Sequence, residues 1–352
     1  MRMEIPESLS HFLESNSETW EKQESFSKLN TFSKPRGIEI FYPNEYYGLD
    51  LIVKAFIGID PEISLVFGIP HGMEIGDDGV GNAFGNGTNL SSYIYYNQIG
   101  LKNMEARSIK GWKIPAEHPL LLLISILKNL DLLKKKPPKN ATLFFPAHRD
   151  EAFDFINKDY DYEVCRALSA GFSKSKQIDV SLQISDISLG RHLIYQKHGF
   201  RVVSSGHRFD PRFLSRFVNL VTSYEQVASS EIGSHLFYTA AIGSSTVFWD
   251  IGLDRLQVPD TQRRKENPFT LDSSIDSLFQ AGHYFNQQTA EKWLGGGEKP
   301  VSKAYWSEIH HDAIKHDRFG LLQPVGQTKK LVIPGVLRRP LVKISKKILL
   351  RQ

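Results

Sequence analysis

The segment that decides the fold runs Ala228-Ser-Ser-Glu-Ile-Gly-Ser-His-Leu-Phe-Tyr-Thr-Ala-Ala-Ile-Gly243 and is followed by the apolar run Ser245-Thr-Val-Phe-Trp249. It predicts a short strand, a turn of small residues, a two-turn helix beginning at Gly233 and Ser234, and a second strand. A helix start leaves backbone N–H groups unpaired and carries partial positive charge, which suits a phosphate or another anion. We therefore predict a diphosphate or ribose site at Gly233, Ser234 and His235; the alternative is a tightly packed helix start without a ligand.

Strands and helices alternate on both sides of this segment, which indicates an α/β protein with parallel sheets. The predicted strands cover residues 37–42, 64–69, 93–96, 141–145, 178–184 and 200–204, and the predicted helices cover residues 46–57, 120–133, 151–173, 189–198 and 211–223. A basic stretch with two consecutive prolines, residues 134–139, interrupts the alternation. Proline prevents helix formation and stiffens a linker, so we expect a domain boundary here.

This boundary predicts four parts along the chain. A polar lead-in of residues 1–36 precedes an α/β domain of residues 37–138. A second α/β domain covers residues 139–320, and a basic segment covers residues 321–352. From residue 329 onward this last segment has eight Lys or Arg and no acidic residue, interleaved with aliphatic side chains. Such a pattern suits the surface of an anionic membrane, and the alternative is a frayed basic tail.

Length, charge and cysteine content narrow the protein class. A chain of 352 residues exceeds one typical core, and its formal net charge of +4 gives no general case for a nucleic-acid partner. The single cysteine, Cys165, excludes an internal disulfide and fits a reducing compartment. Residues 1–22 do not read as a signal peptide, and the longest apolar run, residues 119–127, is far shorter than the roughly 20 residues of a membrane span. We expect a cytoplasmic protein.

A histidine follows the predicted strand of residues 64–69, in the sequence Ile69-Pro-His71-Gly72. Histidine titrates near neutrality, so His71 can take a proton from an attacking hydroxyl, and glycine beside it lets a substrate approach the backbone. The alternative is a histidine that only hydrogen-bonds within a turn. The glycine-rich loop that follows contains Asp77 and Asp78, whose adjacent carboxylates are more often solvated than metal-bound.

Two further predicted strands end in a histidine and arginine pair. His148 and Arg149 follow residues 141–145, and His207 and Arg208 follow residues 200–204. The first pair suits a phosphate, and its alternative is a capping histidine beside a solvated arginine. In the second pair Arg208 can reach an anion in the cleft, and its alternative is an arginine that is only solvated. We predict no metal site, because His310, His311 and His316 lack the i, i+4 spacing of a helical metal site.

With these residues placed, the chain resembles the GT-B-type glycosyltransferases of bacterial capsule, O-antigen and surface-polysaccharide clusters. The matching pieces are Tyr46-Tyr-Gly-Leu-Asp50, Ile69-Pro-His-Gly72, Phe145-Pro-Ala-His148, Gly206-His-Arg-Phe-Asp210 and Ser230-Glu-Ile-Gly-Ser-His-Leu-Phe-Tyr238. More remotely, the layout is similar to CDP-glycerol glycerophosphotransferases and to CMP-sialic acid and CMP-Kdo transferases. The pieces span about three-fifths of the chain.

The resemblance implies two Rossmann-like domains that face each other across a cleft. The first would bind a saccharide or lipid-linked acceptor, with His71 and Asp77 as catalytic groups and Gly72, Glu74 and Asp78 beside the acceptor. The second would bind a nucleotide-sugar donor without a metal ion or other cofactor, and CMP is the favoured nucleotide. Its phosphates would contact seven residues: His148, Arg149, His207, Arg208, Gly233, Ser234 and His235.

Two features of the chain depart from the related families, and other functions stay open. Arg149 follows His148 where CMP-sugar enzymes commonly have proline, and Asp77 and Asp78 only loosely replace the acidic pair of sialyltransferases. The resemblance implies a role in surface-polysaccharide or lipopolysaccharide synthesis, peripheral on the inner face of the plasma membrane. The alternatives are a CDP-alcohol phosphotransferase of teichoic-acid type, a sugar-nucleotide epimerase, and a non-catalytic scaffold of a polysaccharide assembly complex.

Overall fold

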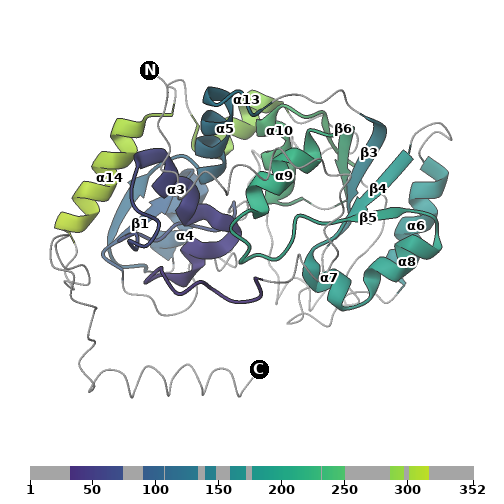
Figure 1. The fold of residues 1–352 in the computed structure, drawn as a ribbon, viewed down its shortest axis with the longest axis horizontal. Coiled ribbons are helices and arrows are strands. Elements are labelled where there is room, and N and C mark those ends of the chain that lie inside the picture. The colour runs from purple at the N-terminus through teal and green to yellow at the C-terminus, as the bar shows by residue number, and fades with distance from the viewer. Residues whose placement is uncertain are drawn as a thin grey trace, which may run out of the picture. The chain divides into compact units, whose positions relative to one another are not determined.

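Helices and parallel strands alternate in the computed structural model of the protein, which confirms the α/β class (Figure 1). The structure describes residues 32–73, 90–106, 108–133, 139–147, 159–171, 177–230, 232–249, 286–296 and 301–316. All of them belong to one compact unit, Met1–His316. Within it the strands form two sheets, one on each side of residues 134–138 in the sequence.

The larger sheet has five parallel strands in the order β5-β4-β3-β6-β7. Its strands are β3 (Lys139–Phe145), β4 (Gln177–Ser181), β5 (Arg201–Val203), β6 (Tyr224–Ser229) and β7 (Thr246–Phe248). Along the chain, β4 and β5 are added on one side of β3, and β6 and β7 are then added on its other side. The strand order therefore reverses between β3 and β6, and open α/β sheets bind their ligands beyond the carboxyl ends of the strands at such a point.

The helices of this part of the chain are α6 (Tyr160–Gly171), α7 (Ile184–Ser188), α8 (Arg191–Lys197), α9 (Phe213–Val221) and α10 (Ser234–Ile242). The core between the sheet and helices α6 to α8 consists of buried apolar side chains, Phe144, Val164, Leu168 and Val180 among them. Cys165 lies in the same core, where burial raises the pKa of its thiol to about 12. This cysteine is a packing residue rather than a reactive thiolate.

The smaller sheet pairs β1 (Ser92–Tyr95) with β2 (Trp112–Pro115) in parallel. Gly68 extends it by a single parallel bridge to Tyr93, so the predicted strand of residues 64–69 is buried but makes only one bridge. The associated helices are α3 (Leu49–Ile57), α4 (Gln98–Ala106) and α5 (Pro119–Asn129). His118 caps α5 by accepting a hydrogen bond from the Leu120 amide, with proline at the first helical position as predicted.

The predicted strand of residues 37–42 is absent, and the predicted helix of residues 46–57 is divided. Residues 37–41 form no strand because their amides are already used: those of residues 36 to 39 donate to the Glu45 carboxylate instead of a neighbouring strand. A 3₁₀ segment, η1 (Tyr42–Gly48), follows and is kinked at Tyr46 and Tyr47 before α3 begins at Leu49.

Two later helices, which the sequence analysis does not predict, are α13 (Gln287–Trp293) and α14 (Lys303–Lys315). Helix α14 packs beside α3 (Figure 1). Its Trp306 is fully buried and donates from Nε1 to the Glu117 carboxylate at 2.9 Å, while α13 packs on α10. The part of the chain that the structure describes has no helix long and apolar enough to cross a bilayer.

Candidate functional site

Seven of the twelve predicted site residues lie in the described ranges. They are His71, Gly72, His207, Arg208, Gly233, Ser234 and His235. The other five, Glu74, Asp77, Asp78, His148 and Arg149, lie outside the described residues. The described residues come from the turns that follow the 64–69 segment, β5 and β6, and the contacts below bring four of these residues, from three turns, together.

The start of α10 lies where the sequence predicts it. Gly233 is the N-cap in an extended conformation, with φ −159° and ψ 174°, and Ser234 is the first helical residue. Gly233 has no side chain that could cap α10. The first backbone amides of the helix therefore need hydrogen-bond acceptors from elsewhere. The helix follows β6 directly, which puts its positive end beside the point where the strand order reverses.

His235 connects the ends of β3 and β6. Its ring stacks on Phe145 with centroids 5.1 Å apart, and its Nε2 lies 2.8 Å from Ser229 Oγ. The Ser229 hydroxyl donates its only hydrogen to the Phe145 carbonyl at 2.9 Å, so it can only accept from the imidazole. Nε2 of His235 therefore carries hydrogen and donates to Ser229.

The turn that holds His71 meets the start of α10. The Met73 amide donates to Ser234 Oγ at 2.9 Å, over a sequence separation of 161 residues. A Cβ atom on Gly72 would lie 3.1 Å from the same oxygen, so a larger residue there would crowd the serine. The predicted residues Gly72 and Ser234 are therefore direct neighbours, and His71 lies beside them in the chain.

Tyr46 lies between His71 and the loop after β5. Its ring is edge-on to the His71 ring at 5.1 Å and packs on Phe209 at the same separation. The Arg208 guanidinium carbon lies 5.3 Å from the centre of the Tyr46 ring, within cation–π range. Arg208 is exposed while His71 is half-buried, so one face of this cluster is open to solvent. Tyr46 thus joins a predicted base and a predicted phosphate ligand.

Tyr47 attaches this cluster to the half of the chain that follows residues 134–138. Tyr47 has a left-handed backbone, φ 59°, and its amide donates to the Arg208 carbonyl at 2.5 Å. Its ring packs on Phe213 with centroids 4.7 Å apart. A non-glycine residue at positive φ is strained and is kept only where its surroundings fix it. The sequence signal was the Tyr46-Tyr47-Gly48 run before a helix, and it carried no predicted role.

Buried contacts of Arg216 and Asp210 hold the loop that contains Arg208. Arg216 forms a buried ion pair with Asp210 and donates from Nε to the Ser205 carbonyl at 3.1 Å. Asp210 also accepts from the Arg212 amide at 2.9 Å. The sequence predicts a helix from residue 211, but residues 211 and 212 form a turn and α9 begins at Phe213.

His207 lies in the same loop as Arg208, but its side chain contacts Phe209 of that loop. Its Nδ1 accepts from the Phe209 amide at 3.2 Å, and its ring stacks on the Phe209 ring at 5.4 Å. Burial, assisted by the positive charge of Arg208, lowers the pKa of His207. These contacts show that His207 stabilises the turn itself; its predicted contact with a phosphate stays a prediction.

Two buried residues that the sequence analysis did not select link the halves behind Ser234. His118 is fully buried, and its Nε2 lies 2.8 Å from the Tyr238 hydroxyl, 120 residues away. Burial raises the pKa of the Tyr238 hydroxyl well above its usual range. Burial lowers the pKa of His118 to about 3, so the imidazole is neutral. The available signal was the i, i+4 spacing of Ser234 and Tyr238, which places them on one helix face.

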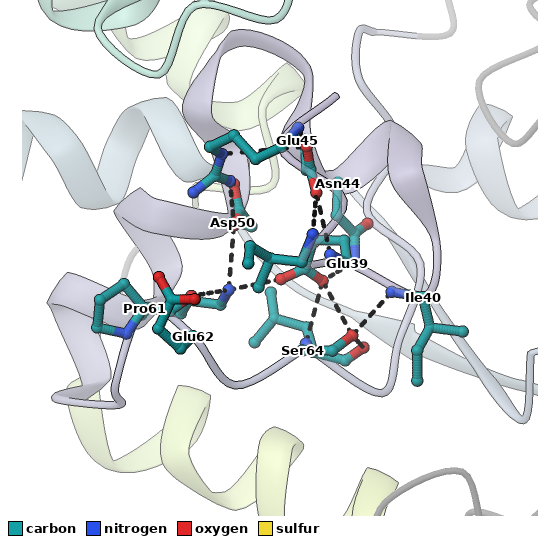
Figure 2. Close-up of polar contacts among 12 residues, drawn as sticks. Glu39, Ile40, Asn44, Glu45, Asp50, Pro61, Glu62 and Ser64 are labelled. Carbon is teal, nitrogen blue, oxygen red and sulfur yellow. Dashed lines mark hydrogen bonds and ion pairs between the residues drawn. The ribbon is translucent and has the colours of Figure 1, made fainter. Parts of the chain in front are cut away.

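A buried charged network joins the segment before α3 to α3 itself (Figure 2). Lys54 is completely buried; its Nζ lies 2.6 Å from Glu39 Oε1 and 3.1 Å from Asp50 Oδ2, and donates to the Pro61 carbonyl at 2.9 Å. Arg36 Nη2 adds a donor to both Asp50 carboxylate oxygens, each 2.6 Å away. Burial and the negative charge of Asp50 raise the pKa of Glu39 to about 7, against the opposing effect of Lys54.

This network holds the 64–69 segment where a strand ladder would otherwise hold it. Glu39 accepts from the Leu65 amide at 3.0 Å, and Asn44 donates to the Phe67 carbonyl at 2.8 Å. The Asn44 carbonyl oxygen also accepts from the Ile69 amide at 2.8 Å. Side chains from the segment before α3 therefore fix the chain up to the residue before Pro70 and His71.

A second buried ion cluster supports the end of β3. Arg191 is 2% exposed and makes a forked contact with Asp161, through Nε at 2.8 Å and Nη2 at 2.6 Å. It also pairs with Asp186 and donates to the Ala147 carbonyl at 2.9 Å. Ala147 directly precedes His148, so this cluster fixes the last described residue before that predicted ligand.

The described residues contain no group of three or more His, Cys, Asp or Glu side chains arranged to hold a metal ion. No known protein-family model matches the chain, and a comparison with curated proteins finds no match.

Proposed function

We propose that the protein is a GT-B-type glycosyltransferase, in which a nucleotide-activated sugar binds the five-stranded half and a saccharide or lipid-linked acceptor binds the half that contains His71. One observation supports this most strongly. The turn of His71, Gly72 and Met73 meets Ser234 at the start of α10, and Tyr46 joins His71 to Arg208. A candidate base and candidate phosphate ligands from the two halves thus share one solvent-accessible cluster.

The donor half has the strand order that favours a nucleotide. The order reverses between β3 and β6, and α10 begins immediately beyond β6. Phosphates commonly bind at such a helix start, where amides and the helix dipole face the anion. In the proposal the diphosphate or monophosphate of the donor contacts Ser234 and Arg208. The charge that develops on the leaving phosphate is met by these groups, and no step is assigned to a divalent metal ion.

The acceptor half offers a base and a neighbouring recess. A small pocket borders Gly72, and its other lining residues are Pro70, Tyr95, Tyr96, Asn97, Gly100 and Met104. Its volume of about 10 Å³ holds no more than one water molecule, so no part of the acceptor is assigned to it. In the proposal His71 removes the proton of an acceptor hydroxyl as its oxygen bonds to the anomeric carbon of the donor sugar. The bond from that carbon to the phosphate oxygen breaks, and the nucleotide leaves with both electrons.

The first test is thermal stabilisation of the full chain by CMP, CDP, UDP, GDP, dTDP and ADP, with and without magnesium. A ligand at a hundredfold excess over its Kd stabilises the folded state by about 2.7 kcal/mol, which shifts the melting temperature measurably. We expect one nucleotide to stabilise the protein without magnesium. If none does, the proposal fails and a non-catalytic scaffold becomes the better account.

Two substitutions then test whether nucleotide affinity depends on Arg208 itself or only on the positive charge of its loop. R208Q removes the exposed cation beside Tyr46, and R212Q removes a cation of the same loop that pairs with Asp210 at 3.8 Å. We expect R208Q to weaken the selected nucleotide about tenfold or more and R212Q to leave it nearly unchanged. Equal effects of the two variants would mean that only the charge of the loop matters. H71A should abolish sugar transfer while nucleotide binding persists.

A further inference from the structure

We infer that Tyr96 is a positioning residue for His71, which it holds through the carbonyl of Pro70. The Tyr96 side chain is buried, and its hydroxyl donates to the Pro70 carbonyl oxygen at 2.6 Å. That oxygen belongs to the peptide bond that joins Pro70 to His71. The inference rests on the proposed function, in which His71 is the base, and adds a residue that serves this base.

The hydrogen bond from Tyr96 completes the constraints on the backbone before His71. The ring of Pro70 fixes its own φ, and the Ile69 amide donates to Asn44 Oδ1 at 2.8 Å. The remaining freedom is rotation about ψ of Pro70, which turns the planar peptide that leads to His71. A hydrogen bond to the oxygen of that peptide restrains this rotation. The direction in which the His71 side chain leaves the backbone therefore depends on Tyr96.

The turn that contains His71 is held by a hydrogen bond at each end. Gly72 has no side chain, and glycine adopts more backbone conformations than other residues, so the sequence does not fix this turn by itself. Tyr96 holds the turn at Pro70, and at its other end the Met73 amide donates to Ser234 Oγ at 2.9 Å. Loss of the Tyr96 hydroxyl therefore releases the end that directly precedes His71.

Tyr96 is itself held through its ring. The ring packs on the His118 ring with centroids 4.8 Å apart. His118 is fully buried, accepts from the Leu120 amide at 3.0 Å and lies 2.8 Å from the Tyr238 hydroxyl. A supporting residue fixes its neighbour only when packing locks its own side chain, and His118 supplies that packing. Replacement of Tyr96 by phenylalanine keeps the ring contact and removes only the hydrogen bond.

The first test measures the position of the His71 ring by NMR in the full chain without substrate. The Tyr46 ring is edge-on to the His71 ring at 5.1 Å, so a nuclear Overhauser contact should join their ring hydrogens. H71A identifies the His71 signal. We expect Y96F to lose this contact and to shift the His71 ring resonance.

Y305F is the matched control for the loss of a tyrosine hydroxyl. At a more exposed position, the Tyr305 hydroxyl also donates to a proline carbonyl at 2.6 Å, that of Pro115. Y305F should leave the His71 resonance and its contact with Tyr46 as they are in the wild type. If Y96F also leaves both unchanged, or if Y305F alters them as much as Y96F does, the positioning role is wrong.

A second measurement does not depend on the folding of a variant. In a mixture of H₂O and D₂O, the Tyr96 ¹³Cζ resonance of the wild-type chain should split into separate signals for the protonated and deuterated hydroxyl. A buried hydroxyl that is hydrogen-bonded exchanges its hydrogen slowly, whereas a free one gives a single averaged signal. A single signal would overturn the inference.

Kinetics separate the failure of this inference from the failure of the proposed function. If the wild type transfers sugar, Y96F should lower kcat about tenfold to a hundredfold and leave the donor Kd within about twofold, because a displaced base does not prevent nucleotide binding. An unchanged kcat would refute the positioning role and leave the function standing. If the wild type transfers no sugar, the proposed function fails, and the NMR measurements alone decide whether Tyr96 positions His71.

Discussion

Gly48 lies so close to Pro211 that a Cβ atom on it would stand 2.1 Å from the Pro211 carbonyl oxygen. The two halves of the chain therefore touch here through backbone atoms, beside the Tyr46 and Tyr47 contacts. Gly48 also has a left-handed backbone, with φ +75°. Only glycine meets both conditions without strain.

Substituting this glycine should separate two costs. In G48A the alanine must adopt a left-handed backbone and also displace the Pro211 loop. In G199A it must only adopt a left-handed backbone, because Gly199 has φ +86° and nothing within 4 Å of the added Cβ atom. We expect G199A to cost about 1–2 kcal/mol of unfolding free energy and G48A about 1–3 kcal/mol more. Urea unfolding measures both. Equal costs would show that the close approach of Gly48 to Pro211 does not resist a methyl group.

Glu39 should make the stability fall as the pH rises. Its pKa is about 7 in the folded chain, mainly because of burial, against an ordinary value of 4.5. Between these values the folded state holds a proton that the unfolded state has released, so its advantage decreases by up to about 1.4 kcal/mol per pH unit. Above pH 7 both states are ionised and the effect is constant.

E39Q tests this because glutamine cannot ionise. Urea unfolding at pH 5, 6 and 7 should show the wild type losing stability relative to E39Q as the pH rises. E62Q, at an exposed position, should run parallel to the wild type. A wild-type advantage that grows with pH would mean that Lys54 and Arg36 dominate and that Glu39 is ionised throughout.

Arg191 should be far more important for stability than its exposed neighbour Arg166. R191M leaves the buried Asp161 and Asp186 carboxylates without a cation, which should cost about 3–5 kcal/mol. R166M breaks an exposed pair with Glu163 at 3.7 Å and should cost under about 1 kcal/mol. Methionine and arginine have similar helix propensity, so chemical denaturation compares the ion pairs directly. Similar costs would contradict the assignment.

The two roles of His118 can be measured separately. Asparagine can still cap α5 but does not reach Tyr238, whereas alanine does neither. We expect H118N to cost about 1–3 kcal/mol for the lost buried hydrogen bond and H118A about 1 kcal/mol more for the lost cap. Thermal and urea unfolding should agree on the order. If H118N is as stable as the wild type, the bond to Tyr238 contributes nothing to folding.

The larger sheet could be predicted because its strands are short apolar runs bounded by turn residues. β3 lies in its predicted run and the start of α10 follows from its small residues, but most of β6 precedes the strand that was predicted from Ala228 onward. The prediction of a strand at residues 37–42 is wrong because the local pattern is overridden by side-chain contacts. Its alternation is that of a strand, but Glu39 and Glu45 turn inward and bind backbone amides, and no local pattern reveals that. β2 ends in proline and exposes Trp112, so it lacks the apolar signal.

The candidate site was predicted where it follows strands and missed where it is assembled from distant residues. His71, Arg208 and Ser234 each stand just after a strand-like run, which sequence can detect. His118 and Tyr238 looked like ordinary helix residues, because the contact that gives them a role joins segments 120 residues apart. Tyr46 was visible as a motif, but its place between His71 and Arg208 depends on how the two halves meet.

The packing of α14 on α3 also sets an order of events during synthesis. The five strands of the larger sheet come from one continuous stretch, residues 139–249. The smaller sheet is made earlier, yet Trp306 of α14 fills its core beside Phe67 and reaches Glu117. Domains usually fold from the N-terminus as the ribosome releases them. We therefore expect the first half to complete its packing only after α14 has been made, later than the sheet of residues 139–249.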